Sequence, residues 1–304
     1  MSRIFYYLFV IPLSYLPLYL LYSLSPIIYF FCYYVFSYRK NVVKLNIQNS
    51  FPDKSLKEQE FIMKAFYLHL SQVIVEGIKN LTISKSELSK RFKITNPEVI
   101  NDLLKNNKSV ILLGGHYGNW EWLITSQSFQ FDGKAYGLGM PMSNKFWGQA
   151  INKKRERFGL KVIHSKNYKE VLAEEKNPYT LLMLGDQSPG DTNKSYWTNF
   201  LNQQTAVQFG TESLANTYDL AVVYFNIDKV RYGYYEMTLT LLTDSPKELS
   251  WGAITQQHTE LLEQQIKKKP YLWMWSHKRW KRDLPEDLDA LKMEQEQRFN
   301  KQFR

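Results

Sequence analysis

The longest uncharged stretch of this chain lies near its N-terminal end, where residues 4–38 contain no Asp, Glu, Lys or Arg. As one straight helix these 35 residues would reach about 50 Å, well beyond the roughly 30 Å of hydrocarbon in a bilayer. The stretch is also too long for the apolar core of a signal peptide. Pro12, Pro17 and Pro26 interrupt it, and its nine tyrosines favour the headgroup boundary. We therefore expect a membrane-embedded kinked span or re-entrant hairpin; the alternative is a buried helix pair of a soluble protein.

Basic residues beside this stretch indicate how the chain is oriented. Arg39, Lys40 and Lys44 follow the stretch, whereas Arg3 alone precedes it. Because positive charge favours the cytoplasmic side of a membrane, we expect the rest of the chain on that side. No Pro/Gly/Ser-rich linker or internal repeat divides the remainder. We therefore predict an anchor over residues 1–38 and a single domain over residues 39–304.

Charge and cysteine content narrow the class of function. The net charge of +10 suits an anionic bilayer, a phosphate-bearing lipid or an acidic carrier protein, as well as a nucleic acid. The chain has one cysteine, Cys32, inside the uncharged stretch. A single cysteine excludes an intramolecular disulfide framework and a cysteine zinc cluster.

Alternating apolar periodicities predict the fold class. Two helices, over residues 38–51 and 55–80, precede a succession of short strands and helices, and Ser55 with Glu58 forms a capping-box pattern. This succession predicts an α/β domain with a mostly parallel sheet flanked by helices. The predicted strands are residues 91–95, 109–113, 135–138, 160–164, 179–184, 220–227 and 234–242; the helices between them are 97–105, 121–129, 144–158, 168–175 and 209–217.

His116 and Glu121 lie in the run from Leu112 to Glu121, which leaves an apolar strand through two glycines. Five residues of helix advance about 500°, so the two side chains can face each other only if His116 precedes the helix that carries Glu121. The glycines allow such a turn, and a helix can follow it. The pattern fits a general base with an orienting carboxylate; the alternative is a hydrogen-bonded structural pair.

A second polar motif follows another predicted strand. Asp186 and Gln187 come directly after the strand at residues 179–184. Because ligands bind beyond the carboxyl ends of parallel strands, we expect this motif at the same rim as His116. The two residues are candidates to hold an acceptor headgroup or to orient a binding loop; alternatively, Asp186 caps the turn at residues 188–191.

The segment around His277 combines positive charge with tryptophan. Lys278 and Arg279 follow His277, and Trp273, Trp275 and Trp280 are interleaved with the basic residues. Such a mixture can bind single-stranded nucleic acid by stacking and phosphate contact. Behind an N-terminal anchor it better fits a phosphate and headgroup surface at the membrane plane. We therefore predict substrate-binding roles for His277, Lys278 and Arg279, and no nucleic-acid partner.

Six blocks in order make nearly the whole chain resemble the bacterial lipid A biosynthesis acyltransferases (lauroyl and myristoyl transferases) of the lysophospholipid acyltransferase superfamily. After the uncharged anchor, these blocks are Tyr38-Arg39 with Asn46, Ser50-Phe51-Pro52-Asp53, Gly115 to Glu121, Arg155 to Gly159, Gly185-Asp186-Gln187 with Phe209-Gly210, and Trp273 to Lys281. A His and an acidic residue at this spacing occur often by chance. The ordered blocks are far more specific.

This resemblance implies transfer of a fatty acyl chain from a thioester, carried by acyl-carrier protein or coenzyme A, to a hydroxyl or amine of a lipid acceptor. His116 would act as general base, with Glu121 selecting the tautomer of its ring and stabilising the imidazolium. No Gly-x-Ser-x-Gly elbow occurs, so a direct ternary mechanism is expected.

Other residues of the matched blocks would contact the substrates. The family pattern places Arg155 as a third catalytic residue that stabilises the oxyanion. Arg157, two positions further along the chain, is the alternative candidate for this role. Free N–H groups around the Gly118 turn would be a further source of oxyanion donors. Gly118 and Asn119 are expected to contact substrate. The resemblance also implies membrane lipids as partners, no bound cofactor, and a catalytic domain on the cytoplasmic face of the bacterial inner membrane.

Two other classes of function remain open at the level of sequence. One is a non-enzymatic, basic membrane-surface or nucleic-acid-binding protein, which the net charge alone would allow. The other is a metal hydrolase that uses His116, Glu121 and a distant His164 or His277. The chain lacks a close ligand pair such as His-Glu-x-x-His, so we expect no metal site.

Overall fold

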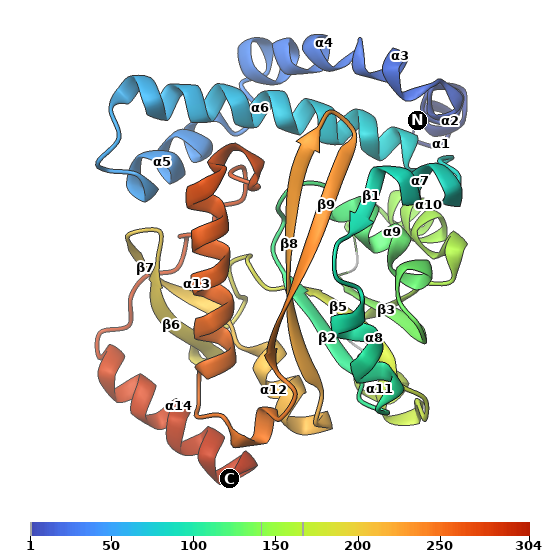
Figure 1. The fold of residues 1–304 in the computed structure, drawn as a ribbon. Helices are drawn as coiled ribbons and strands as arrows, with labels where there is room; N and C mark the ends of the chain where they lie inside the picture. The colour runs from blue at the N-terminus through green and yellow to red at the C-terminus, as the bar shows by residue number, and fades with distance from the viewer. Residues whose placement is uncertain (1, 141, 166) are drawn as a thin grey trace.

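A seven-stranded sheet forms the centre of the computed structural model, which describes residues 2–140, 142–165 and 167–304 (Figure 1). The strand order is β1-β9-β8-β2-β5-β3-β4. Every neighbouring pair is parallel except β8 with β9, so the prediction of a mostly parallel α/β sheet is confirmed. The strands are β1 (Phe92–Ile94), β2 (Val110–Gly114), β3 (Lys134–Gly139), β4 (Lys161–His164), β5 (Tyr179–Leu184), β8 (Ala221–Arg231) and β9 (Tyr234–Thr243).

The middle of this sheet is buried on both faces. All five residues of β2 are buried, and β5 is buried except at its last residue. Such strands read as continuous apolar runs because helices cover both faces of a parallel sheet. Beyond the N-terminal stretch, the α-helices are α5 (Lys40–Ser50), α6 (Leu56–Lys79), α7 (Lys85–Arg91), α8 (Glu98–Lys105), α9 (Trp120–Gln130), α10 (Lys145–Arg155), α11 (Tyr168–Glu174), α12 (Gly210–Tyr218), α13 (Ala253–Lys268) and α14 (Leu288–Phe303).

The beginning of α6 follows the predicted capping box. The Ser55 hydroxyl accepts the backbone N–H of Glu58, and the Glu58 carboxylate accepts the backbone N–H of Ser55 at 2.8 Å. Both bonds satisfy N–H groups that the first turn of a helix leaves free.

The sequence patterns missed several elements of the C-terminal half. A two-stranded antiparallel hairpin, β6 (Ser195–Phe200) with β7 (Gln203–Gln208), lies outside the main sheet. Helix α13 was also missed because its buried face carries polar Thr255, His258 and Gln265 beside Ile254 and Leu262, which weakens the apolar stripe.

The uncharged N-terminal stretch forms a broken helix that lies along α6 (Figure 1). The backbone is extended at Leu16 and Pro17, which separates the first helical portion from α3, as the prolines predict. Leu18 and Leu21 are buried in the main core beside the sheet. The pieces are α1 (Ser2–Phe5), the π-helix η1 (Tyr6–Val10), α2 (Ile11–Tyr15), α3 (Leu18–Tyr22), α4 (Ser25–Phe30) and the π-helix η2 (Phe31–Val35).

Candidate active site

His116 lies in the turn between β2 and α9, outside the helix that carries Glu121, as the spacing requires. The turn is tight: Gly118 has a φ of +61°, and a Cβ there would lie 2.8 Å from the side chain of Ile227. A side chain at this position would be strained both by its backbone conformation and by this contact. The glycine therefore shapes the turn that presents His116.

Asp186 holds the ring of His116. One carboxylate oxygen, Oδ1, lies 2.6 Å from His116 Nδ1. The other, Oδ2, accepts the His116 backbone N–H at 2.9 Å and the Trp273 indole N–H at 2.9 Å. Asp186 is 5% exposed, so this carboxylate is buried with all these donors directed at it. The arrangement fixes the ring orientation and places a proton on Nδ1.

Adjacent strands bring these two residues together. β2 and β5 are parallel neighbours, with Gly114 paired with Leu184, and the Gly185 N–H donates to the Gly114 carbonyl at 2.9 Å. The sequence placed Asp186 at the same rim as His116 but offered it as a headgroup ligand, a loop orienter or a turn cap. Its position on Nδ1 makes it the orienting partner of His116.

The pair shifts the proton affinities of both groups. Burial alone lowers the pKa of His116, but the charge and hydrogen bond of Asp186 outweigh it, so the pKa lies above its usual value. Burial likewise disfavours the Asp186 carboxylate, yet His116 and Trp273 together hold its pKa well below its usual range. The electrostatics therefore favour an ionised Asp186 and stabilise an imidazolium at His116.

The other ring nitrogen of His116, Nε2, is not bound to Asp186 and lies beside Gln187. The amide nitrogen of Gln187 lies 3.3 Å from His116 Nε2, and the His116 side chain is 19% exposed. With the Nδ1 proton directed to Asp186, Nε2 is the acceptor in this contact. A substrate hydroxyl could replace the Gln187 N–H at this position, which agrees with the substrate-binding role predicted for Gln187.

Glu121 does not orient His116; it is paired with Arg155. The Arg155 guanidinium donates through Nε to Glu121 Oε2 at 3.0 Å and through its second terminal nitrogen to Oε1. The expectation that Glu121 selects the tautomer of His116 is therefore wrong, because Asp186 occupies that position. Both charged side chains are about one quarter exposed, and the oxyanion role expected for Arg155 stays a prediction.

Arg157 is not paired with Glu121 and instead binds backbone carbonyls. Its guanidinium donates to the carbonyls of Lys154 and Ile83 and packs over the ring of Phe158, and burial lowers its pKa to about 10. It makes structural contacts between α10 and the segment that precedes α7.

Three backbone N–H groups of the turn around Gly118 are already engaged. The Tyr117 N–H donates to Gly115, and the Gly118 N–H donates to the Leu272 carbonyl at 3.0 Å. The His116 N–H is bound to Asp186. The predicted oxyanion role is therefore wrong for the Gly118 N–H, because the turn uses this donor to hold its own shape.

Asn119 is a structural residue of this turn. It is 1% exposed, its Oδ1 accepts the N–H of Trp122 at 3.0 Å as the N-cap of α9, and its amide donates to Glu76 at 2.6 Å. A side chain so enclosed cannot contact substrate, so the predicted binding role is wrong. Glu76 is itself fully buried and also accepts hydrogen bonds from the hydroxyl groups of Tyr22 and Tyr235.

The sequence analysis missed Glu76 altogether. A lone glutamate within the apolar stripe of α6 was the available signal, since a buried carboxylate requires donors. Trp273, whose indole holds Asp186, was read only as part of a basic and aromatic surface.

The C-terminal segment around His277 contacts the loop that follows Asp186 and Gln187. His277 Nε2 accepts the backbone N–H of Ser188 at 3.0 Å, and burial chiefly lowers its pKa to about 4, so the ring is neutral. Arg279 is 2% exposed, donates to the Thr205 hydroxyl and packs over Phe200, and is therefore enclosed rather than open to a headgroup. Lys278 is exposed and stays a predicted contact for substrate.

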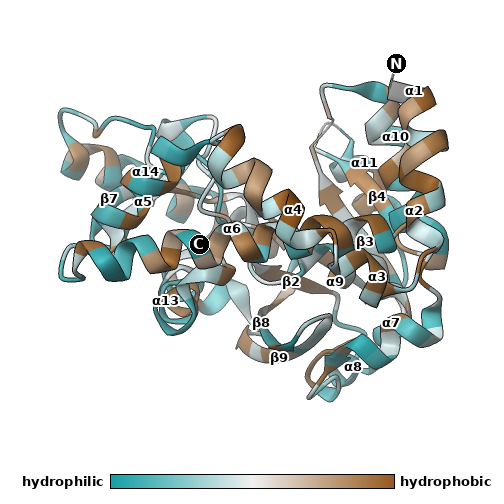
Figure 2. Ribbon diagram, turned by 90° about the horizontal axis from the view of Figure 1, so that it is seen from above, coloured by the Kyte–Doolittle hydropathy of each residue, from teal (hydrophilic) through white to brown (hydrophobic). Residues whose placement is uncertain are grey.

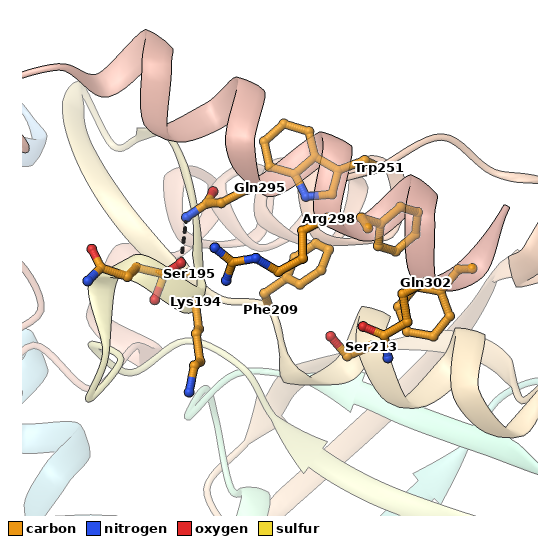
Figure 3. Close-up of a pocket in the computed structure, with 11 residues that line it drawn as sticks. Lys194, Ser195, Phe209, Ser213, Trp251, Gln295, Arg298 and Gln302 are labelled. Carbon is orange, nitrogen blue, oxygen red and sulfur yellow. Dashed lines mark hydrogen bonds between the residues drawn. The ribbon is translucent and has the colours of Figure 1, made fainter.

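A separate hollow of ≈ 270 Å³ lies under α14, and its lining includes Lys194, Phe209, Trp251, Gln295 and Arg298 (Figure 3). Gln295 donates to the carbonyl of Asn193 at 3.0 Å, which ties α14 to the loop before β6. None of the predicted site residues lines this hollow. Over the described residues, no group of three or more His, Cys, Asp or Glu side chains is arranged to hold a metal ion.

Comparison with known proteins identifies one family. The model of the family described as bacterial lipid A biosynthesis acyltransferase matches residues 3–282, which include the broken N-terminal helix, the sheet and every predicted site residue. Helix α14 lies beyond the matched residues. A search of curated proteins finds no match to the chain.

Proposed function

The chain belongs to the bacterial lipid A biosynthesis acyltransferase family, and we propose that this acyltransferase moves a fatty acyl chain from a thioester to a hydroxyl or amine of a lipid acceptor. The observation that carries the proposal is the bond between His116 Nδ1 and buried Asp186, which leaves Nε2 to act as the base on a side chain that is 19% exposed. A lipid A-like glycolipid is the acceptor class that the family favours.

The proposed reaction is one direct transfer. His116 Nε2 takes the proton of the acceptor hydroxyl or amine while that atom attacks the thioester carbonyl carbon. The new bond to carbon forms, the carbonyl becomes an oxyanion, and Asp186 stabilises the imidazolium. The carbon–sulfur bond then breaks, and the imidazolium returns its proton to the thiolate that leaves. No covalent acyl-enzyme is needed, and every proton is accounted for by His116.

The oxyanion requires donors placed beside His116. Arg155 is one candidate, held at the site by its two bonds to Glu121. The Gln187 amide, 3.3 Å from His116 Nε2, is another. A single donor of this kind is typically worth about 3 kcal/mol of transition-state stabilisation.

An apolar face on the broken N-terminal helix and α6 supports membrane attachment. Large exposed side chains cover it, and Figure 2 displays hydrophobic residues along α2, α4 and α6. Residues 18–35 and α6 are each long and apolar enough to cross a membrane by length and composition, although 56% of the α6 window is buried in the protein. Exposed members of this face include Phe5, Leu8, Tyr15, Tyr19, Phe36 and Phe61.

We propose that this apolar face rests in one leaflet, with the sheet on the cytoplasmic side of the bacterial inner membrane. Contiguous exposed apolar surface of this kind is typical of membrane or partner contact. Arg39, Lys40 and Lys44, which follow the stretch, would meet the anionic headgroups of the cytoplasmic leaflet. The protein would bind no resident cofactor. Its net charge of +10 suits both anionic acyl donors, acyl-carrier protein and acyl-coenzyme A.

Acyl transfer by the purified protein in detergent tests this function. A labelled acyl chain should move from acyl-carrier protein or acyl-coenzyme A to a lipid acceptor extracted from cells that lack the gene. Because His116 carries the proton, His116→Ala should lower the rate by about 10²–10⁴-fold. His164→Ala, a matched change at the end of the outermost strand β4, should keep the rate of the unchanged protein. Full activity of the folded His116→Ala variant would refute the proposal.

A further inference from the structure

A second hollow opens where the tip of the β8–β9 hairpin meets α6, and its volume is ≈ 390 Å³. Figure 1 shows the hairpin reaching up to α6 at this point. The lining includes Leu68, His69 and Gln72 of α6 and Lys229, Arg231 and Tyr232 of the hairpin. No acidic residue lines the hollow. Two basic side chains, Lys229 and Arg231, therefore line the hollow without a lining carboxylate.

Lys229 is half-buried and contacts neutral groups. Its Nζ donates to Gln72 Oε1 and lies 3.4 Å from His69 Nδ1. It also lies 5.3 Å from the ring centre of Tyr232. Among the described residues, no carboxylate lies within salt-bridge distance of Lys229 or Arg231. Burial lowers the pKa of Lys229, which is the cost of a charge that lacks a direct counter-ion.

The nearby acids are already bound to other groups. The charge of Glu76 raises the pKa of Lys229 through space, but the Glu76 oxygens accept hydrogen bonds from Tyr22, Tyr235 and Asn119. Asp228, next to Lys229 in the chain, is paired with Lys269. A mobile anion is therefore the group that would complete the hollow.

The rim of the hollow is apolar and continues into the apolar face. Val230 and Tyr232 are 56% and 62% exposed at the hairpin tip, and Leu68 is 37% exposed on α6. The ring of Tyr232 lies 5.9 Å from that of Tyr22 in the broken N-terminal helix. Positive charge directly beside exposed apolar side chains is the arrangement that suits the headgroup level of a bilayer.

We propose that this hollow is a binding site for the phosphate of an anionic phospholipid headgroup, with Lys229 and Arg231 as its ligands. The phosphodiester supplies the counter-ion that Lys229 lacks, and the acyl chains of the same lipid lie against Val230, Tyr232 and the apolar face. A free phosphate satisfies the charges but leaves the apolar rim uncovered, so the lipid is the favoured occupant. The site is separate from His116, and its occupation does not depend on the acyl-transfer reaction.

Calorimetric titration of the full-length protein in detergent tests this site with three soluble probes. These are dihexanoyl phosphatidylglycerol, dihexanoyl phosphatidylcholine and inorganic phosphate, each kept below any micelle-forming concentration. We expect the phosphatidylglycerol to bind most tightly. Lys229→Gln and Arg231→Gln should each weaken its binding by about 10- to 100-fold, since each removes a charge-assisted contact.

The matched control is Lys301→Gln, which removes the same charge from an exposed site on α14 at the opposite end of the molecule (Figure 1). It should leave the affinity unchanged. Arg231 is exposed, so its variant keeps the test valid should the Lys229 variant fold poorly. Unchanged affinity in Arg231→Gln, equal binding of the phosphatidylcholine, or equal binding of inorganic phosphate would each overturn the lipid-headgroup site.

Discussion

Two carboxylates lie near His116, and each holds a different partner. Asp186 binds the ring of His116, while Glu121 binds the guanidinium of Arg155. Glu121 also raises the pKa of His116 through space, as a smaller contribution than that of Asp186. In our account Asp186 orients the base and Glu121 positions the cation that faces the oxyanion. Glu121 is therefore a positioning residue, and its effect should pass through Arg155.

A double-mutant cycle on Glu121 and Arg155 tests this division of roles. Arg155→Gln should lower kcat by about 10²-fold, because it removes one oxyanion donor. Glu121→Gln should also lower kcat, because it releases the guanidinium. The double variant should be about as slow as Arg155→Gln alone, since both changes remove one contact. Losses that multiply in the double variant, with thermal melting unchanged, would show that Glu121 acts independently of Arg155.

The pairing of these carboxylates was only partly predictable from the sequence. The glycines and the helix pattern placed His116 in a turn, and the strand ends placed Asp186 at the same rim. Glu121 was chosen for the ring because it is five residues from His116, whereas Asp186 is 70 residues away. Which carboxylate meets Nδ1 depends on the register between β2 and β5, and this register is a tertiary property.

The elements around the catalytic turn are joined by one buried carboxylate. Glu76 on α6 accepts one hydrogen bond from Asn119, the N-cap of α9, and another from Tyr22 on α3. Because a buried carboxylate is stable only when donors surround it, these elements support one another. The broken N-terminal helix is thereby tied to the turn that presents His116, and it adds stability as well as apolar surface.

Removal of one hydroxyl tests this connection. Tyr22→Phe should lower the free energy of unfolding by about 1–2 kcal/mol, because Glu76 loses a donor while the packing of the ring is kept. Tyr19→Phe is the matched control, since Tyr19 lies on the same helix but is 73% exposed. Thermal melting in detergent is the measurement. Equal melting temperatures for the two variants would show that Tyr22 contributes nothing through Glu76.

Among the secondary-structure elements, the sequence predicted the sheet strands well and the C-terminal elements poorly. β2 and β5 stand out because they are short apolar runs bounded by polar or glycine-rich segments. The hairpin β6–β7 and helix α13 bury polar side chains such as Thr205 and His258, so their apolar patterns are faint. Their partners lie far away in the chain, and only the folded structure reveals them.

The whole molecule combines an apolar face with a polar site at the carboxyl ends of β2 and β5. The broken N-terminal helix and α6 form that face, while the parallel sheet brings His116 and Asp186 together. In the function we propose, the acyl chains stay at the apolar face while the reacting atoms meet His116. The separation of the apolar face from the polar site follows from the fold rather than from any single motif.

We propose that Asp186 makes His116 an effective base, and the pH dependence of kcat measures this effect. Only the neutral ring accepts a proton, so kcat should rise with pH through the pKa of His116, whose midpoint lies above the ordinary value of 6.5. Asp186→Asn removes the charge that raises this pKa while burial still lowers it. We therefore expect Asp186→Asn to be slower, with its midpoint at lower pH, and Glu121→Gln to show a much smaller shift of the midpoint. An unchanged midpoint in Asp186→Asn, together with a large shift in Glu121→Gln, would contradict this proposal.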